Sequence, residues 1–491
     1  MKRFLSLLLL MVMVLSCAAV FSSCKKNCKG PVTEDLAFDL FSDGLLCVER
    51  DGKYGYIDKT GTEVIPCAYG YATAFENGTA VVGDGGGSLC FIGTDGARIL
   101  EDTFVTAYPF DAWDRAVVMR TYTGDVELID KSGATVFSAK AIEPGNNGYY
   151  VFTTGDRKEG MIDKNGEIVL AAAYDELWFV GNVKTKGFDV TCYTDGDRLI
   201  ARGKSEGESK STYRLIDYSG KEIFVGDEYT EFESYFVNGR ILAARHRDYC
   251  IIDRDGKMIA EGMPGSPGDI KLSGGILFDV GEKAGKWNDG YVLYDWDGNV
   301  VFDFRDSGYK TTRNVSVIGG VLIAESGSDT TKTGVMNEKG EIVVPCEYVI
   351  DDGLNGNGCY IARNREGDYT VFDAAGNTVF ERSSCSFLQA YQNTLKGQYY
   401  VACKLNEDGT AGYEVIDPAG KTVKTFGSEY YETGTGDYSF RRFSTCGYYN
   451  DGFFVYVDGE TRKLVILDDE FEPISDAVYS HIISGNVSLV D

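Results

Sequence analysis

The sequence predicts an all-β protein built from tandem β-hairpin repeats of about 40 residues. The first observation behind this is composition: 60 glycines, 32 tyrosines and 27 phenylalanines against only nine prolines favour short strands joined by tight turns. The second is a turn motif that recurs along the chain. The third is a pair of apolar positions that flank the turn. With 43% apolar residues in 491, the chain can bury a large core.

The recurring turn has the form Asp-x-x-Gly, with Asn in place of Asp in one copy. The first and last residues of its nine copies are Asp58 and Gly61, Asp130 and Gly133, Asp163 and Gly166, Asp217 and Gly220, Asp253 and Gly256, Asp295 and Gly298, Asn337 and Gly340, Asp373 and Gly376, and Asp417 and Gly420. A relaxed copy runs from Gly93 to Gly96, and a last copy at Asp468 to Phe471 lacks the glycine. Terminal repeats are often atypical.

The flanks of the turn show that each copy is a hairpin. An apolar residue precedes the turn in the ten copies that keep the glycine, and Val or Ile stands three residues after that glycine in all ten. Asp can hydrogen-bond the turn backbone, Gly can adopt positive φ, and a β-branched residue suits the start of the second strand. A further strand is expected before each hairpin, as at 44–48.

The N-terminus resembles a bacterial lipoprotein signal, because Lys2 and Arg3 precede an apolar stretch that ends in small residues and cysteines. Residues 1–23 are assigned as the signal peptide and 24–35 as a tether. Cys24 is the favoured lipidation site, since a polar run follows it directly. Cys17 is the alternative, because Phe21 is a poor match three places before Cys24.

The repeats divide at the Pro/Gly-rich segment 261–269, which is expected to be a linker. About six repeats fall in the N-terminal array, residues 36–260, and about five in the C-terminal array, residues 270–491. Short strands at this period match propeller blades, and propellers typically have four to eight. Two propeller-like rings are therefore favoured, with one larger ring or an open array as alternatives. Similar strands near both ends of the chain suit a single ring.

The sequence contains no recognisable catalytic or metal-binding constellation. It has only two histidines, His246 and His481, so a multi-histidine metal site is excluded. Both are interpreted as ordinary surface residues. The acidic turns lack the calcium-loop register, and the glycine-rich stretch 83–87 lacks a phosphate-loop lysine. No catalytic residue, metal or cofactor is therefore assigned. The long insertion within 180–212 is interpreted as a solvated excursion rather than a binding loop.

The cysteine content bears on disulfides, and the net charge bears on the class of partner. Thirteen cysteines are present, and Cys67 and Cys346 share one repeat position, which favours structural thiols over a disulfide framework. The net charge of −27 would repel phosphate backbones, so nucleic acid is not an expected partner.

Three segments resemble the bacterial WG repeat, also called the KWG repeat. They are Lys53–Pro66 followed by Tyr69, Gly160–Val169, and Gly334–Pro345. The tryptophan of the repeat is replaced by Tyr54, Glu159 and Thr333, so the array is divergent. The resemblance implies a β-repeat architecture and an interaction role, and it brings no catalytic residues.

Together these observations predict a surface-displayed, lipid-anchored binding or scaffold module that recognises a protein or glycan partner. It is expected to be exported, attached to the outer face of the membrane or cell envelope through its lipid, and monomeric. A glycan-active hydrolase on a propeller scaffold and an architectural envelope protein are the alternatives, since 75 acidic residues cannot exclude a carboxylate pair.

Overall fold

A computed structural model describes the chain from residue 39 onwards. The described residues are 39–145, 147–186, 189–193, 197–204, 210–226, 230–233, 235–245, 248–267, 275–280, 290–317, 320–325, 332–350, 358–383, 385, 387–390, 399–405, 410–430, 447–448, 451–457, 463–484 and 487–490. The segment predicted as a signal peptide, Cys17, Cys24 and His246 lie outside them. Within this part of the chain, no helix has the length and apolarity needed to span a bilayer.

The strands of the described residues form eleven small sheets, which we call blades 1 to 11 in chain order. Blade 1 contains β1 (Leu45–Arg50), β2 (Lys53–Asp58), β3 (Glu63–Tyr69), β44 (His481–Ser484) and β45 (Val487–Val490). Blade 2 contains β4 (Tyr71–Ala72), β5 (Thr79–Gly83) and β6 (Leu89–Gly93). Blade 3 contains β7 (Thr106–Ala107), β8 (Arg115–Met119), β9 (Val126–Asp130) and β10 (Thr135–Ala139). Blade 4 contains β11 (Ala141–Pro144), β12 (Tyr149–Thr153), β13 (Glu159–Asp163) and β14 (Ile168–Tyr174).

The middle of the chain forms blades 5 to 8. Blade 5 contains β15 (Glu176–Phe179), β18 (Arg198–Gly203), β19 (Thr212–Asp217) and β20 (Glu222–Val225). Blade 6 contains β16 (Gly181–Lys186), β17 (Asp189–Tyr193), β21 (Glu231–Phe232), β22 (Tyr235–Val237), β23 (Arg240–Ala244), β24 (Tyr249–Asp253) and β25 (Met258–Met263). Blade 7 contains β26 (Ser266–Pro267), β27 (Gly275–Asp279), β28 (Tyr291–Asp295) and β29 (Val300–Asp303), and the 3-10 helix η2 (Phe304–Asp306) follows it. Blade 8 contains β30 (Tyr309–Val317), β31 (Gly320–Glu325), β32 (Thr333–Asn337) and β33 (Ile342–Tyr348).

The last three blades complete the array. Blade 9 contains β34 (Cys359–Arg363), β35 (Tyr369–Asp373) and β36 (Thr378–Arg382). Blade 10 contains β37 (Phe387–Ala390), β38 (Tyr400–Leu405), β39 (Thr410–Ile416) and β40 (Thr422–Tyr430). Blade 11 contains β41 (Gly447–Tyr448), β42 (Phe454–Val457) and β43 (Leu464–Leu467). The predicted fold class, an all-β array of hairpin repeats, is confirmed.

Each blade is packed on both faces, because it stands between two neighbours. On β1, Leu45 and Cys47 belong to a core cluster shared with blade 2, whereas Leu46 and Val48 belong to one shared with blade 11. Successive side chains of a strand point to opposite faces, so one short apolar run serves two interfaces. The cores of this protein therefore lie between blades rather than within one central nucleus.

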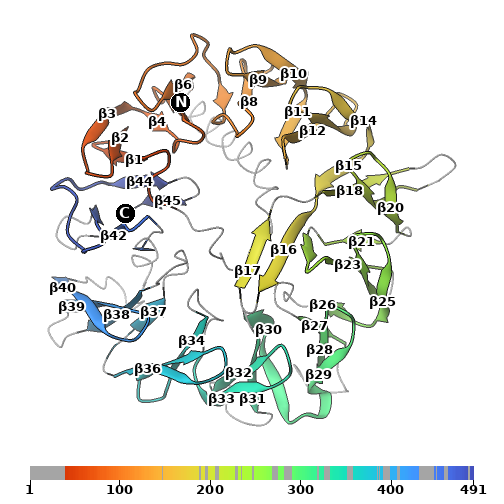
Figure 1. The fold of residues 1–491 in the computed structure, drawn as a ribbon, viewed down its shortest axis with the longest axis vertical. Helices are drawn as coiled ribbons and strands as arrows, with labels where there is room; N and C mark the ends of the chain where they lie inside the picture. The colour runs from red at the N-terminus through yellow and green to blue at the C-terminus, as the bar shows by residue number, and fades with distance from the viewer. Residues whose placement is uncertain are drawn as a thin grey trace, which may run out of the picture.

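The blades stand around one ring, and the preference for two rings is wrong (Figure 1). The first strand of the array, β1, pairs with β44 near the chain's end, with Cys47 opposite Ile483 and Glu49 opposite His481. This pairing closes the ring with the chain's own termini. The inner strand of blade 1 therefore comes from the C-terminal end of the chain. A sheet closed by its own ends leaves no free blade face at either terminus.

The segment 261–269, predicted as a linker, does not separate two arrays. Its described residues include the end of β25 and all of β26. Met263 packs in one core cluster with Leu242 of blade 6 and with Ile276 and Phe278 of blade 7. The glycine and proline residues there belong to the connection between the outer strand of blade 6 and the inner strand of blade 7.

Candidate functional site

The Asp-x-x-Gly turn is held by its own aspartate. Asp58 Oδ1 accepts hydrogen bonds from the backbone N–H groups of Thr60 (2.9 Å) and Thr62 (3.0 Å). The N–H of Gly61 donates to the carbonyl of Asp58, and Gly61 has a φ of +75°. A hydrogen bond from the Thr60 hydroxyl holds the pKa of the Asp58 carboxyl below its usual value. Oδ1 of this aspartate is therefore fully engaged by its own turn.

The other turns repeat this geometry. The same oxygen caps backbone N–H groups two and four residues later at Asp130, Asp163, Asp217, Asp253, Asp295, Asn337, Asp373, Asp417 and Asp468. Positive φ is found at Gly96, Gly133, Gly166, Gly220, Gly256, Gly298, Gly340, Gly376 and Gly420. In the copy without glycine, Phe471 itself has a φ of +61°.

Each turn glycine also touches the preceding blade. A methyl group on Gly166 would lie 2.6 Å from the carbonyl oxygen of Val136, and one on Gly256 would lie 2.3 Å from that of Ile223. Val136 and Ile223 are the β-branched residues three places after the preceding turn glycine. In these blades the two sequence signatures are the two sides of one inter-blade contact, which the pattern alone did not reveal, whereas Gly220, Gly298 and Gly420 contact the residue that follows the β-branched one.

All the turns lie on one face of the ring, which we call the turn face. Within blade 3, Arg115 lies opposite Asp130, so the start of β8 stands beside that blade's turn. Arg115 Nε also donates to the carbonyl of Lys164 in the turn of blade 4 (2.5 Å). Arg198 of blade 5 donates in the same way to Arg254 of blade 6 (3.1 Å). The predicted turn residues are therefore brought to one face, one set per blade.

The opposite face, which we call the loop face, carries the loops at 51–52, 84–88, 120–125 and 154–158 and presents exposed aromatic side chains. Tyr122 is 61% exposed and Tyr71 is 43% exposed. A methyl group on Gly87 would lie 2.7 Å from the Tyr122 hydroxyl oxygen, so the Tyr122 side chain lies close to the glycine-rich loop of blade 2. Asp84 caps that loop by accepting from the N–H of Gly86 (2.7 Å). These residues form a polar and aromatic surface.

The position of the missing tryptophan lies at the loop-face end of the blade, and at Glu159 and Thr333 it joins neighbouring blades. Glu159 Oε2 accepts from the N–H of Leu177 in blade 5 (2.5 Å), and Thr333 Oγ1 accepts from the N–H of Ile350 (2.9 Å). Tyr54 bonds His481 Nδ1 instead (2.9 Å). Seven residues before the turn glycine, six blades have tyrosine: Tyr54, Tyr213, Tyr249, Tyr291, Tyr369 and Tyr413.

Glu159 makes the joint between blades 4 and 5 sensitive to pH. Burial raises its pKa to about 7, and the neighbouring carboxylates Glu143 and Glu176 act in the same direction. Because the pKa is higher in the folded than in the unfolded chain, protonation favours folding. That stability is complete below the ordinary value of 4.5 and is lost as the pH rises through about 7.

We expect Glu159→Gln to stabilise the protein at pH 8 by about 1–2 kcal/mol after allowance for solvent screening, and to have little effect at pH 5. Glutamine keeps the oxygen that accepts from Leu177. Urea unfolding midpoints between pH 5 and 8 measure the difference. Glu347→Gln, at an exposed glutamate of β33, is the control. A constant effect of Glu159→Gln across this range would contradict the assignment.

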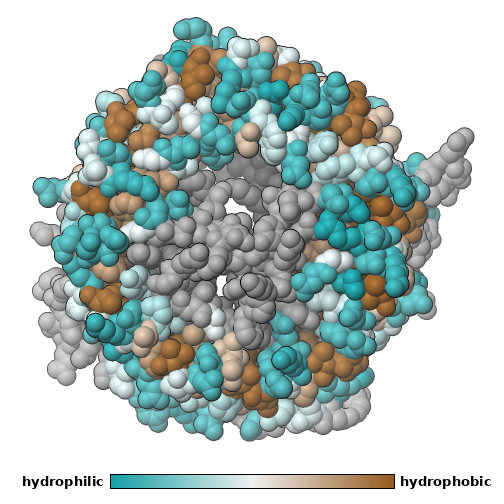
Figure 2. All heavy atoms as spheres, viewed as in Figure 1, coloured by the Kyte–Doolittle hydropathy of each residue, from teal (hydrophilic) through white to brown (hydrophobic). Residues whose placement is uncertain are grey.

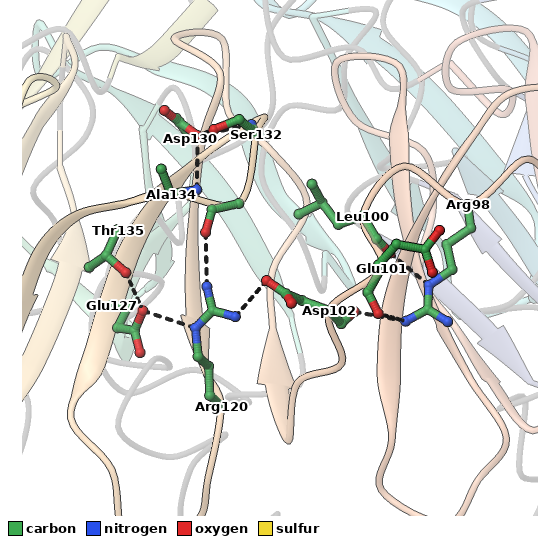
Figure 3. A network of polar contacts seen from close by, with 11 residues as sticks. Arg98, Leu100, Glu101, Asp102, Arg120, Glu127, Asp130, Ser132, Ala134 and Thr135 are labelled. Atoms are coloured by element: carbon green, nitrogen blue, oxygen red, sulfur yellow. Dashed lines mark hydrogen bonds and ion pairs between the residues drawn. The ribbon is translucent and has the colours of Figure 1, made fainter.

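Two arginines stabilise an irregular part of the ring between blades 2 and 3 (Figure 3). After β6, residues 97–104 make only isolated bridges with that strand. Arg98 donates to the carbonyls of Leu100 (2.6 Å) and Asp102 (2.9 Å). Arg120 contacts the Asp102 carboxylate (2.7 Å), Glu127 Oε2 (3.1 Å) and the carbonyl of Gly133 (2.9 Å). All these contacts are internal, so the cluster serves the fold.

The histidine and cysteine side chains also serve the packing. His481 is only partly exposed and bonds Tyr54 at the ring closure, so it is not the ordinary surface residue that was expected. Cys67 and Cys346 do not form disulfides. Cys67 packs against the core between blades 11 and 1, and Cys346 against that between blades 7 and 8. Burial raises the pKa of Cys346 to about 11, which disfavours the reactive thiolate.

Among the described residues, one group of acidic side chains has the spacing of a cation site. It consists of Asp468, Asp469 and Glu470. Asp468 already caps its own turn through Oδ1, and the other two side chains are exposed. The group is the last turn of the array, and no metal is assigned to it.

The long insertion within 180–212 was misjudged from its polar composition. It contains the hairpin β16–β17, and β16 pairs in parallel with β22 of blade 6, with Gly181 opposite Tyr235. Figure 1 shows this hairpin extending from the inner edge of the ring towards its middle. The alternation in Asp189–Tyr193 could have indicated a strand. Residues 205–209 of the polar run lie outside the described residues.

Comparison with known proteins supports the repeat assignment. A family model described as "WG containing repeat" matches residues 54–86, 160–182 and 334–349. A search of curated proteins found no match.

Similar solved structures include a eukaryotic initiation factor (12% identity, 74% of this chain and 96% of that chain, TM-score 0.36). They also include the computationally designed Ika8 protein (11%, 72% and 94%, TM-score 0.24) and BamB from Moraxella catarrhalis (13%, 71% and 94%, TM-score 0.25). Similarities this low carry no inference about function. The three matches show that the chain contains WG repeats, and the eleven turns on eleven blades extend the same turn pattern along the ring.

Proposed function

We propose that this protein is a surface-displayed, lipid-anchored binding or scaffold module that recognises a protein or glycan through its loop face. The observation that carries the proposal is the exposed pair Tyr71 and Tyr122 on that face. Tyrosine presents a large rigid ring with a polar tip, and it is enriched at recognition surfaces. The ring beneath is stiffened by contacts that every blade repeats, which favours a preorganised surface.

The charge of the chain supports a neutral or cationic partner. A net charge of −27 repels polyanions, so nucleic acid is not proposed. Asp84 and Asp125 lie in the same loops as the glycine-rich stretch and Tyr122. Asp84 accepts from the Gly86 N–H and Asp125 pairs with Lys140, and each carboxylate keeps acceptor capacity for sugar hydroxyls or lysine side chains. No cofactor forms part of the proposal.

Binding is tested with the soluble chain 30–491 on glycan arrays and in pull-downs against envelope proteins. We expect Tyr122→Ala to reduce binding at least tenfold. Ile168→Ala is the matched control, because Ile168 is also 61% exposed but lies on the turn-face side of blade 4. Equal binding by both variants would remove the loop face from the proposal. Product release from a bound glycan would favour a hydrolase instead.

The anchor is a separate proposal, because it rests on the sequence before residue 39. We expect Cys24→Ala to release the protein from the membrane fraction, since a thioether-linked lipid at that residue is the proposed attachment. Fractionation of expressing cells and a mass spectrum of the mature N-terminus measure this. Release by Cys17→Ala alone would assign the other cysteine.

A further inference from the structure

The chain enters the ring at the turn face, where its first described residues are firmly packed. The Leu40 and Phe41 side chains are buried, and their N–H groups donate to the Asp451 carboxylate at 2.9 and 3.3 Å. The Phe41 ring lies 4.7 Å from that of Phe453. Lys59, in the turn of blade 1, stands 5.9 Å from the Phe41 ring. Any tether that precedes residue 39 therefore leaves from the turn face.

The length of that tether keeps the ring close to its anchor. Fourteen residues lie between Cys24 and Asp39, and a fully extended chain over this stretch spans at most about 50 Å. A short tether raises the effective concentration of the attached surface near the membrane to about the millimolar range. Contacts too weak to bind a free protein can then orient an anchored one.

Exposed aliphatic side chains lie on the outer strands at the rim of the ring, most of them close to the turns. Eight of the ten large apolar residues that are most exposed stand on outer strands, two to five residues after a turn glycine: Val64, Ile168, Val169, Val225, Val300, Ile342, Val379 and Val423. The other two are Tyr71 and Tyr122 of the loop face. A space-filling view shows hydrophobic residues at intervals around the ring (Figure 2).

We propose that the anchored ring rests with its turn face towards the lipid bilayer and presents its loop face outwards. This rests on the proposed lipid anchor. The occupant of the turn face is a zwitterionic lipid headgroup surface, since the net charge of −27 disfavours an anionic one. Aliphatic side chains at the rim can enter the interfacial region, whereas the tyrosine loops remain free for a partner.

The test measures how accessible each face is on phosphatidylcholine vesicles that carry the lipidated protein. Thr94, in the turn of blade 2, and Thr123, in a loop of blade 3, are replaced one at a time by p-azidophenylalanine. Both threonines are exposed, which makes them a matched pair. Each variant reacts with a strained-alkyne polyethylene glycol of about 5 kDa, a size that a bilayer surface excludes. The Cys24→Ala form of each variant provides the rate without an anchor.

We expect the anchor to slow the reaction at position 94 at least fivefold and to leave position 123 unchanged. Equal rates at both positions, or slowing at position 123 alone, would overturn the orientation. Vesicle flotation is measured first and separates the two proposals. Failure to float would overturn the anchor and the orientation that rests on it, whereas flotation with equal rates would overturn the orientation alone.

Discussion

Replacing Gly166 by alanine is expected to destabilise the ring by about 2–4 kcal/mol, because two penalties add. Gly166 has a φ of +78°, where an L side chain costs about 1–2 kcal/mol. Its new methyl group would also lie 2.6 Å from the carbonyl oxygen of Val136, which is backbone of the preceding blade. Blades 3 and 4 would have to separate locally to admit it. Urea unfolding monitored by circular dichroism measures the loss.

Gly52 provides the matched control for this prediction. It has a φ of +76°, and a methyl group there would meet nothing within 4 Å. Gly52→Ala should therefore cost only the backbone term, about 1 kcal/mol. The difference between the two variants measures the inter-blade contact. Equal losses would show that the turn glycines act only through φ.

The turns were the most predictable part of the fold because their signals are local. A side chain such as that of Asp58 accepts from N–H groups two and four residues away, so its role can be predicted from the neighbouring residues of the sequence. The hairpins and their number followed from this. Gly166 is required for two reasons, its positive φ and its close approach to the preceding blade. Only the first can be predicted from the sequence, because the second depends on which blade is the neighbour.

The ring count was not predictable from local signals. The number of rings depends on whether the two ends of the chain pair with each other. They do so through backbone hydrogen bonds between β1 and β44, and backbone pairing of this kind requires no particular side chains. The Pro/Gly cluster at 261–269 has the composition of a linker, yet Met263 is buried between two blades. A Pro/Gly-rich composition indicates a turn in the backbone, but it does not show whether the strands on either side of that turn belong to one array or to two.

The candidate site was predicted least well. The sequence drew attention to the acidic turns, but one side-chain oxygen of the first turn residue already accepts from the turn backbone in ten of the eleven blades. The exposed residues Tyr71 and Tyr122 carry no motif, because exposure depends on which loops neighbour them. Arg120 likewise became meaningful only when the fold brought Asp102, Glu127 and Gly133 around it.

The ring closure should depend on one carboxylate. Asp451→Ala is expected to destabilise the protein by about 2–5 kcal/mol, since it leaves the buried N–H groups of Leu40 and Phe41 without an acceptor. Lys59 Nζ also lies 3.4 Å from the Asp451 carboxylate, but the lysine side chain is 49% exposed, whereas that of Asp451 is 5% exposed. A half-exposed ion pair contributes at most about 1 kcal/mol.

Lys59→Met therefore separates the two contributions at the closure. It removes the charge and keeps an apolar stem against Phe41 and Phe453, so its cost should stay below about 1 kcal/mol. Hydrogen exchange locates the effect: Asp451→Ala should speed exchange in β1 and β44, where the two ends of the chain pair, and leave blades 5 and 6 unchanged. If Lys59→Met costs as much as Asp451→Ala, the ion pair rather than the backbone hydrogen bonds holds the ends together, because only the charge is common to both changes.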